Sequence, residues 1–269
     1  MQEITSFQNP KFKNVLGLME RRDRKKEKKF LIEGFRELTR ALIGGAKFFE
    51  LWICPELFLG ENEQSLIEQI IAKGAVCYKV PKPLFEKLSY RDRPDGLLAV
   101  SPFFNVSLEE IEKKIKGKNE CLILVAEGIE KPGNLGSILR SSDAVRVDAV
   151  ISVDPRTDIF NPNVIRSSVG TLFTQPVCEA TSEETLAFLK SHGFKLMEAT
   201  PAGDRVYTDC DLKGKVALVV GCEQLGLTPL WMDQCDIKVR IPMLGVADSL
   251  NVSTATTLLL YEYRRQNAL

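Results

Sequence analysis

The stretch Ile241-Pro-Met-Leu-Gly-Val-Ala-Asp-Ser-Leu-Asn-Val-Ser-Thr-Ala-Thr-Thr257 predicts a strand, a loop and a helix in direct succession. The strand is expected over residues 237–243, and the loop ends at Ser249-Leu250-Asn251, where a long apolar helix begins. Ser and Asn side chains accept hydrogen bonds from the free N–H groups of a helix start. The exposed backbone donors there can hold a polar ligand. Because strand–loop–helix segments of this kind are common, the stretch predicts a ligand site but does not indicate which ligand binds there.

The second half of the chain alternates strand patterns with helical patterns. Residues 121–126 form a continuous apolar run, as expected of a central strand that is buried on both faces. Similar runs lie at 149–153, 195–199, 216–220 and 237–241, and helical patterns lie near 134–145, 162–170, 182–190 and 251–265. This alternation predicts an α/β domain with a mostly parallel sheet of five or six strands. The loops after Ala126, Val220 and Ile241 should form one cleft at the carboxyl ends of the strands.

The first half predicts a smaller α/β domain with a partly parallel sheet. Strand patterns lie at 30–32, 48–54, 76–80 and 97–100, and helical patterns lie at 5–19, 34–43, 63–73 and 82–89. Glycine-containing turns separate these runs. Residues 105–118 are polar and rich in lysine, which is typical of a linker helix or turn. The expected organisation is therefore a first domain at 1–104, a linker at 105–118 and a second domain at 119–269.

Charge is unevenly distributed, although the formal net charge is zero. Residues 1–118 carry 22 Lys and Arg against 17 Asp and Glu, and residues 119–269 carry 14 against 19. A basic half joined to an acidic half favours contact between the first half and a polyanion, although a merely solvated surface has the same composition. The densest run, at 21–29, contains the candidate phosphate-binding residues Arg21, Arg22, Lys25, Lys26, Lys28 and Lys29.

The rest of the composition argues against several classes of function. The seven cysteines show no C-x-x-C spacing, and several lie in apolar runs, which is typical of reduced structural thiols in a cytoplasmic protein. His192 is the only histidine, so we expect no metal site with His ligands and no Ser-His or Cys-His catalysis. The first residues show no signal pattern, and no apolar run approaches the roughly 20 residues of a membrane helix. We therefore expect a cytoplasmic protein with no membrane segment and no metal.

Three segments of the second half carry a more specific pattern. Pro132-Gly-Asn-Leu-Gly-Ser-Ile-Leu-Arg140 is the first, Val219-Val-Gly-Cys-Glu223 with Gly226-Leu227 is the second, and the 241–257 stretch is the third. In this order they resemble the motifs of the SpoU/TrmH family of RNA 2′-O-ribose methyltransferases. Lys131, Cys222 and Gln224 differ from the usual neighbours of these motifs.

The resemblance implies a fold that the sequence patterns alone do not predict. The C-terminal domain would be an α/β knot with a deep trefoil knot, a feature that general topology rules disfavour because knots are rare. A weaker similarity over roughly the first 100 residues implies a ribosomal-protein-like RNA-binding domain. The family also implies a homodimer formed through the C-terminal domain. The last helix fits that expectation because it is apolar on more than one face.

The resemblance implies that S-adenosylmethionine is the cofactor and that backbone groups of Gly221, Ile241 and Leu250 hold it. Gly221 would let the cofactor approach the main chain closely. The implied catalytic residues are Asn134, Arg140, Glu223, Ser249 and Asn251.

The six-residue spacing of Asn134 and Arg140 suggests that both lie near one helix start. Two roles for Arg140 remain open, a general base or an electrostatic clamp. We favour the clamp, on the adjacent phosphate and the developing oxyanion, because a guanidinium is not easily deprotonated. Asn134 would orient Arg140 or the ribose, and Glu223 would hold Arg140 or Asn134. Ser249 and Asn251 would complete the site.

These features favour an S-adenosylmethionine-dependent RNA 2′-O-methyltransferase, with rRNA favoured over tRNA as the substrate. One alternative is a catalytically inactive RNA-binding protein of the same fold, which the intact set of motif residues disfavours. Another is a nucleotide-dependent oxidoreductase. The glycines at 128, 133 and 136 do not form a G-x-G-x-x-G fingerprint, and no Walker A motif is present, so this class is disfavoured as well.

Overall fold

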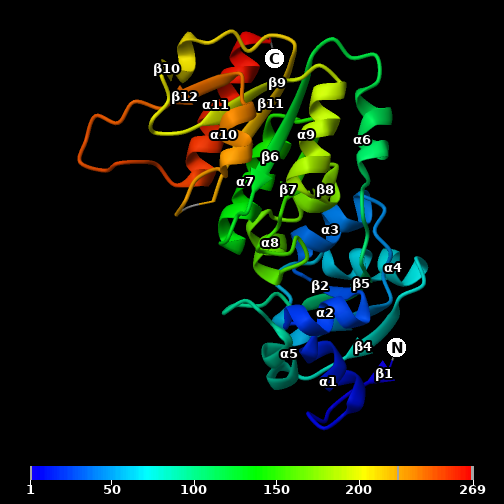
Figure 1. The fold of residues 1–269 in the computed structure, drawn as a ribbon. Coiled ribbons are helices and arrows are strands. Elements are labelled where there is room, and N and C mark those ends of the chain that lie inside the picture. Colours follow the sequence, from blue (N-terminus) through cyan, green and yellow to red (C-terminus); the bar gives the residue numbers. More distant parts are fainter. Residues whose placement is uncertain (1, 223, 268–269) are drawn as a thin grey trace. The chain divides into compact units, whose positions relative to one another are not determined.

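The computed structural model describes residues 2–222 and 224–267 (Figure 1). The chain divides into two compact units. One unit comprises Met1–Phe104 together with Asp158–Thr174, and the other comprises Asn105–Thr157 together with Gln175–Leu269. The inclusion of residues 158–174 in the first unit was not expected from the sequence. No helix in the described parts of the chain combines the length and the apolar character needed to cross a membrane.

The first unit is built on a five-stranded mixed sheet with the order β1-β4-β3-β5-β2. Strand β4 (Val76–Lys79) is parallel to β1 (Gln2–Glu3) and β3 (Glu50–Ile53), whereas β5 (Leu97–Pro102) is antiparallel to β3 and to β2 (Lys29–Glu33). The partly parallel sheet predicted for this half is thus confirmed. The helices of the unit are α1 (Pro10–Gly17), α2 (Arg21–Glu27), α3 (Phe35–Ile43), α4 (Glu63–Ala72), α5 (Lys82–Leu88) and α8 (Pro162–Ser167).

Aromatic contacts join residues 158–174 to the rest of the first unit. The ring centroid of Phe160 lies 4.6 Å from that of Phe30 and 4.2 Å from that of Phe103. The ring of Phe173 stacks against Phe30 with centroids 6.1 Å apart. Because Phe30 is fully buried in β2, the inserted segment completes the hydrophobic core of this unit.

An ion pair adds a second connection of this segment to the first unit. The buried guanidinium of Arg24 donates to Asp158 Oδ2 at 2.9 Å and to the carbonyl oxygens of Leu18 and Met19 at 3.0 and 2.7 Å. Burial of a charged group is costly unless its donors are paired, and here the pairing fixes the position of α2. Arg24 therefore has a structural role, although it belongs to the basic run at 21–29.

The second unit is built on a seven-stranded sheet with the order β10-β12-β9-β11-β6-β7-β8, in which every neighbouring pair is parallel. The strands are β6 (Cys121–Glu127), β7 (Ala149–Val153), β8 (Val177–Ala180), β9 (Lys195–Ala199), β10 (Arg205–Val206), β11 (Lys215–Val220) and β12 (Ile237–Arg240). The expected number of five or six strands was too low. Strands β8 and β10 have only four and two residues, too few to give a clear apolar pattern.

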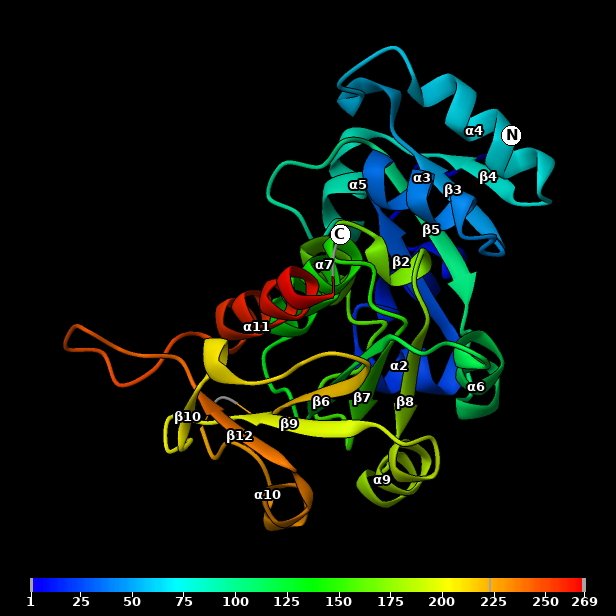
Figure 2. The ribbon, with the colours of Figure 1, turned by 90° about the horizontal axis from the view of Figure 1, so that it is seen from above.

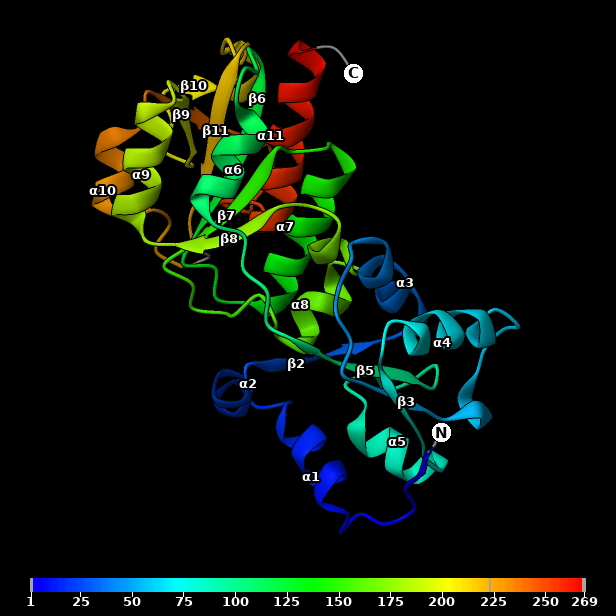
Figure 3. The ribbon, with the colours of Figure 1, turned by 90° about the vertical axis from the view of Figure 1, so that its right-hand side faces the viewer.

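Helices cover both faces of this sheet (Figures 2 and 3). On one face α6 (Leu108–Ile115), α9 (Ser182–Ser191) and α10 (Pro229–Gln234) contribute Ile111, Leu189 and Trp231 to one buried cluster. On the other face α7 (Pro132–Ala144) and α11 (Val252–Gln266) pack side by side. Residues 105–118, interpreted as a linker, thus contain a helix that packs within the second unit.

The end of α11 is fixed by side-chain amides that bind the backbone of residues 210–214. Asn267 Nδ2 donates to the Leu212 carbonyl at 2.9 Å, and Asn267 Oδ1 accepts from the Gly214 N–H at 3.3 Å. Gln266 makes an equivalent pair with the Cys210 carbonyl and the Leu212 N–H, at 2.9 and 2.8 Å. These contacts hold the C-terminal helix against the connection between β10 and β11.

We expect Asn267→Ala to lower the free energy of unfolding by about 1–3 kcal/mol, because it leaves buried backbone groups of residues 212 and 214 without partners. Thr254→Ala, at an exposed position of the same helix, is the matched control. Chemical denaturation of both variants measures the difference. Equal stability of the two variants would contradict the anchoring role of Asn267.

Candidate active site

A cavity of about 590 Å³ lies where three adjacent strands of the second unit end. Its lining includes Val220 and Gly221 at the end of β11, and Val239 and Ile241 at the end of β12. Residues 199–201, at the end of β9, contribute as well. The opposite wall is formed by residues 248–252 and Ala255, from the loop before α11 and the first turn of that helix. The cavity therefore occupies the carboxyl edge of a parallel sheet, where ligands bind in this class of fold.

Five of the predicted site residues line this cavity. They are Gly221, Ile241, Ser249, Leu250 and Asn251. Asn251 is the N-cap of α11, and its Oδ1 accepts a hydrogen bond from the Ser253 N–H at 2.9 Å. The helix start predicted from the sequence is therefore confirmed.

Asn134 also belongs to this site. It lies in the first turn of α7, and its Oδ1 accepts a hydrogen bond from Asn251 Nδ2 at 3.1 Å. The start of α7 and the start of α11 thus meet at the edge of the cavity. This contact joins the first and third sequence motifs, which lie 117 residues apart along the chain.

Arg140 is not among the residues that line the cavity. It follows Asn134 by six residues on α7, which corresponds to about 9 Å along the helix axis. The two side chains therefore do not share one helix end, as their spacing had suggested. Arg140 is exposed, and no side chain of residues 2–222 and 224–267 pairs with its guanidinium. Glu223, the remaining predicted catalytic residue, lies outside the described residues.

Gly221 is required by the fold of its own loop. A Cβ atom at this position would lie 2.3 Å from the carbonyl carbon of Gly226 and 2.5 Å from the Leu227 nitrogen. Next to it, the backbones of Cys222 and Gly226 exchange two hydrogen bonds of 3.1 Å. The glycine was expected for close approach of the cofactor, whereas the structure gives a tight turn of the chain as the reason.

The sequence interpretation missed the contribution of β9. Thr200 and Pro201 line the cavity directly after this strand, while the loop after β6 contributes only Lys131. The available signal was the apolar run at 195–199, because the carboxyl ends of neighbouring parallel strands meet at one edge. The end of β6 instead holds the cavity wall in place. The buried Glu127 carboxylate accepts hydrogen bonds from the Thr228 N–H and hydroxyl at 2.9 and 2.7 Å.

The chemistry of the lining suits a ligand with an apolar ring system and polar substituents. Aliphatic side chains such as Val220, Ile241 and Leu250 offer flat apolar contact. Thr200 and Ser249 add hydroxyl groups at the same cavity. A nucleoside joined to an amino acid has this character, and the volume lies in the usual range of small-molecule sites. The residues therefore fit S-adenosylmethionine, and the parallel sheet and its cavity define an α/β enzyme that binds a nucleoside-type cofactor.

Comparison with known families identifies the group to which this chain belongs. The model of the SpoU rRNA Methylase family matches residues 121–261, and that of the MRM3-like substrate binding domain matches residues 9–99. The chain belongs to the SpoU family, whose members are S-adenosylmethionine-dependent RNA 2′-O-ribose methyltransferases. The family, the reaction and the cofactor inferred from the sequence are thus confirmed. Membership implies the trefoil knot in the second unit.

Individual relatives cover 98–100% of this chain. The 23S rRNA (guanosine(2553)-2′-O)-methyltransferase RlmP of Bacillus subtilis is 27% identical over 264 residues, which span 98% of this chain and 100% of the relative. The crystal structure of an RNA 2′-O ribose methyltransferase has a TM-score of 0.85 and 38% identity over 100% of both chains. The AdoMet-bound rRNA methyltransferase of Sinorhizobium meliloti has a TM-score of 0.88 and 28% identity over 98% of this chain and 97% of its own.

We expect Gly221→Ala to weaken S-adenosylmethionine binding by about tenfold or more, because the added methyl group must displace the backbone of residues 226–227 from the cavity wall. Gly245→Ala is the matched control, since a Cβ atom there meets nothing within 4 Å. Isothermal titration calorimetry measures both affinities. Unchanged affinity in Gly221→Ala would show that this wall does not contact the cofactor.

We expect Cys222 to be the thiol that iodoacetamide modifies first at pH 8, and we expect S-adenosylhomocysteine to slow the modification. Cys222 is partly exposed at the cavity. Burial raises the pKa of Cys178 to about 11 and that of Cys235 to about 12, so both stay protonated at this pH. Peptide mass spectrometry identifies the modified residue. The same rate with and without the ligand would argue against binding next to Cys222.

Proposed function

We propose that this chain methylates a ribose 2′-hydroxyl of ribosomal RNA, with the cavity of the second unit as its cofactor site. The observation that carries the proposal is the hydrogen bond between Asn251 and Asn134 at the edge of that cavity. It joins two polar motif residues beside a site that suits a nucleoside-type ligand. The rRNA substrate is proposed because the B. subtilis relative is named as a 23S rRNA methyltransferase.

The cavity residues would contact the apolar and the polar parts of the cofactor separately. Val220, Ile241 and Leu250 would bury the adenine ring, and backbone groups of Gly221, Ile241 and Leu250 would fix its polar edge. Ser249 would hydrogen-bond a polar substituent. When bound, S-adenosylmethionine supplies an activated methyl group to the attacking oxygen.

The side chains around the cavity would prepare the ribose hydroxyl for attack. Negative charge develops on this oxygen as its proton leaves, and fixed donors that face it lower the barrier. Asn251 Nδ2 donates one hydrogen to Asn134 and retains a second N–H for the ribose. Arg140 stays charged at neutral pH, and its forked donors match a phosphate group. In this proposal Arg140 binds the adjacent phosphate and stabilises the negative charge that develops on the ribose oxygen. Glu223 holds Arg140 or Asn134 in position.

We propose that the first unit, residues 1–104 with 158–174, binds RNA and that the second unit, residues 105–157 with 175–269, carries out catalysis. Within the basic run, Arg22, Lys25, Lys26 and Lys28 are exposed, with the Lys26 ammonium 3.9 Å from Glu27 Oε1 and the Lys28 ammonium 5.9 Å from the centroid of the Phe103 ring. Arg21 also faces solvent, but its Nε lies 3.7 Å from Asp158 Oδ2. Lys29 is half-buried, with its ammonium 5.6 Å from the centroid of the Phe49 ring. We expect weaker phosphate contacts from Arg21, which lies near a buried carboxylate, and from Lys29, which is half-buried.

We further propose a cytoplasmic homodimer formed through the second unit. On α11, Leu259 and Leu260 are buried within one chain, whereas Leu258 and Tyr261 remain 37% and 51% exposed. The helix thus presents apolar surface on a second side, which a partner copy would cover. Light scattering that gives a monomer mass at micromolar concentration would contradict the dimer.

We expect Arg140→Ala to reduce turnover on RNA by roughly 10²–10³-fold, the usual loss for one charge-stabilising donor. Cofactor affinity should not change, because Arg140 does not line the cavity. Arg146→Ala, which removes another exposed arginine just after α7, is the matched control. Full activity of Arg140→Lys would contradict the forked contact, since lysine cannot donate in that geometry.

We expect label from methyl-labelled cofactor to appear in alkali-resistant dinucleotides of ribosomal RNA. Alkali cleaves RNA through attack by the 2′-hydroxyl, and methylation of that oxygen prevents the cleavage. Hydrolysis followed by chromatography separates the dinucleotides from mononucleotides, and tRNA treated in parallel tests the substrate class. Release of all label as base-methylated mononucleotides would contradict ribose methylation. No incorporation into any RNA would favour an inactive RNA-binding protein.

A further inference from the structure

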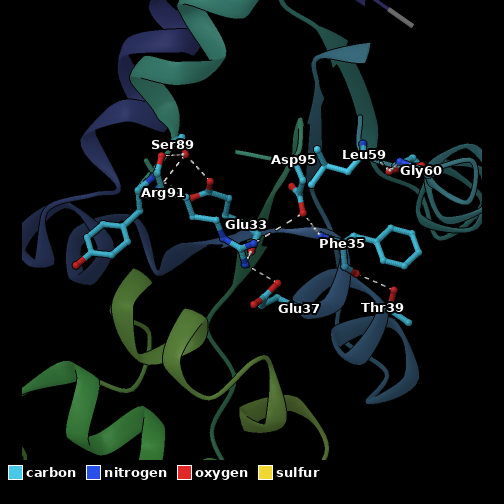
Figure 4. A network of polar contacts seen from close by, with 11 residues as sticks. Glu33, Phe35, Glu37, Thr39, Leu59, Gly60, Ser89, Arg91 and Asp95 are labelled. Atoms are coloured by element: carbon cyan, nitrogen blue, oxygen red, sulfur yellow. Dashed lines mark hydrogen bonds and ion pairs between the residues drawn. The ribbon is translucent and has the colours of Figure 1, made fainter. Parts of the chain in front are cut away.

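The first unit contains a buried network of charged side chains that lies outside the catalytic machinery (Figure 4). Glu33, Glu37 and Asp95 are each more than 90% buried, and they surround the guanidinium of Arg91. Arg91 Nη2 lies 2.6 Å from Glu37 Oε2 and donates to the Glu33 carbonyl at 3.0 Å. Arg91 Nη1 lies 3.8 Å from Asp95 Oδ2. Two carboxylates and one main-chain carbonyl thus share one guanidinium.

The network fixes the loop of residues 89–95 at both ends. At one end, the Glu33 carboxylate accepts hydrogen bonds from the Ser89 hydroxyl and, at 2.8 Å, from the Tyr90 N–H. At the other end, Asp95 Oδ2 accepts from the Phe35 N–H at 2.8 Å. Burial raises the pKa of Glu33, which shows that its ionised form is costly in this position.

Gly34 permits the central contact of this network. Its φ angle is +108°, and a Cβ atom there would lie 2.3 Å from Arg91 Nη2. The guanidinium therefore packs directly on the main chain between β2 and α3. A loop that merely connected α5 to β5 would not require three buried carboxylates and a glycine in a left-handed conformation. The cost of this arrangement suggests that the position of the loop matters for function.

The anchored loop presents an aromatic ring and positive charge to solvent. Tyr90 is 43% exposed although its backbone is fixed by Glu33. Arg93, on the same loop, is exposed. Arg166 of α8 is exposed as well, and it lines one small surface hollow together with Tyr90 and Arg91. Glu33, Glu37 and Asp95 are buried, whereas Asp92, Arg93 and Arg166 are exposed, so one carboxylate and two guanidinium groups of this region face solvent.

We propose that this surface, formed by Tyr90, Arg93 and Arg166, binds an unpaired nucleotide of the RNA substrate. The inference rests on the proposed function and adds a single-stranded element to the substrate that the first unit recognises. The base would stack on the Tyr90 ring, and Arg93 and Arg166 would hold the flanking phosphates. Arg91 is a positioning residue, since it acts through the loop.

The chemistry of the surface favours RNA with an accessible base. Stacking of a base on an aromatic side chain contributes about 1–3 kcal/mol, and it tolerates any base because each has an aromatic face. In a duplex both faces of each base are covered by its neighbours, so recognition of bases concentrates on loops, bulges and ends. Arg166, which lines the same hollow as Tyr90, and Arg93, three residues after Tyr90 on the loop, would supply contacts that position the backbone.

The test uses the full-length protein and a 12-nucleotide RNA with a central 2-aminopurine, either as a single strand or in a blunt duplex. We expect quenching of the 2-aminopurine on binding of the single strand, and weaker binding of the duplex. Tyr90→Leu should raise the Kd for the single strand by about 5–100-fold and abolish the quenching. Tyr90→Phe should retain both. Arg166→Gln should reduce the log–log salt slope by up to about one unit.

Phe7→Leu is the matched control, because Phe7 is another aromatic residue of the first unit with 47% exposure. It should bind the single strand as the wild-type protein does. Equal affinity of Tyr90→Leu and wild type, or equal wild-type affinity for single strand and duplex, would overturn the proposal. A change in oligomeric mass of Tyr90→Leu with unchanged RNA affinity would indicate a protein contact instead and would overturn it too.

A cofactor titration in the same samples separates this inference from the proposed function. S-adenosylmethionine should bind wild type and Tyr90→Leu with equal affinity, since the cavity lies entirely within the second unit. In methylation assays Tyr90→Leu should raise the KM for RNA and leave kcat unchanged. Loss of cofactor binding by the wild-type protein would contradict the proposed function. Intact methylation with an unchanged KM in Tyr90→Leu would contradict only the nucleotide-binding surface.

Discussion

Side-chain amides hold both ends of α11, and the cavity at the strand ends of the second unit depends on this helix. At its start Asn251 caps the first turn and binds Asn134, and at its end Gln266 and Asn267 bind the backbone of the 210–214 connection. Between these ends the Thr257 hydroxyl lies 2.6 Å from that of Ser141 on α7. A helix fixed at two points cannot slide along the sheet. The loop of residues 241–251 therefore reaches the strand ends in a defined position.

In the first unit, too, a few polar side chains fix the position of a segment, but here they are charged groups instead of amides. Arg24 and Arg91 are each surrounded by acceptors that fix their positions, and each holds a segment that local sequence preferences would leave loose. In both units, buried polar groups act across long stretches of chain, while apolar burial gives the sheets their stability. The arrangement separates two tasks, because hydrophobic cores build the layers and a few polar contacts fix the positions of loops.

How much the sequence predicts depends on how local the deciding interactions are. Strands such as β6 and β7 were predictable because a strand buried on both faces gives an unbroken apolar run. The packing of Phe160 on Phe30, which assigns residues 158–174 to the first unit, joins positions 130 residues apart and leaves no local pattern. The site followed the same rule. The resemblance of three motifs to a known family indicated Asn251, Ser249 and Asn134, whereas the wall after β9 and the turn that requires Gly221 depend on tertiary contacts.

The insertion of residues 158–174 limits how this protein can be recombined with its relatives. A chimera that exchanged only the first 104 residues would separate Arg24 from Asp158 and Phe30 from Phe160 and Phe173. The transplanted domain would then expose an aromatic surface and leave a buried guanidinium without its carboxylate, a costly state. The first unit is therefore encoded by two separate stretches of sequence. Exchange of a domain as one continuous block would break its core.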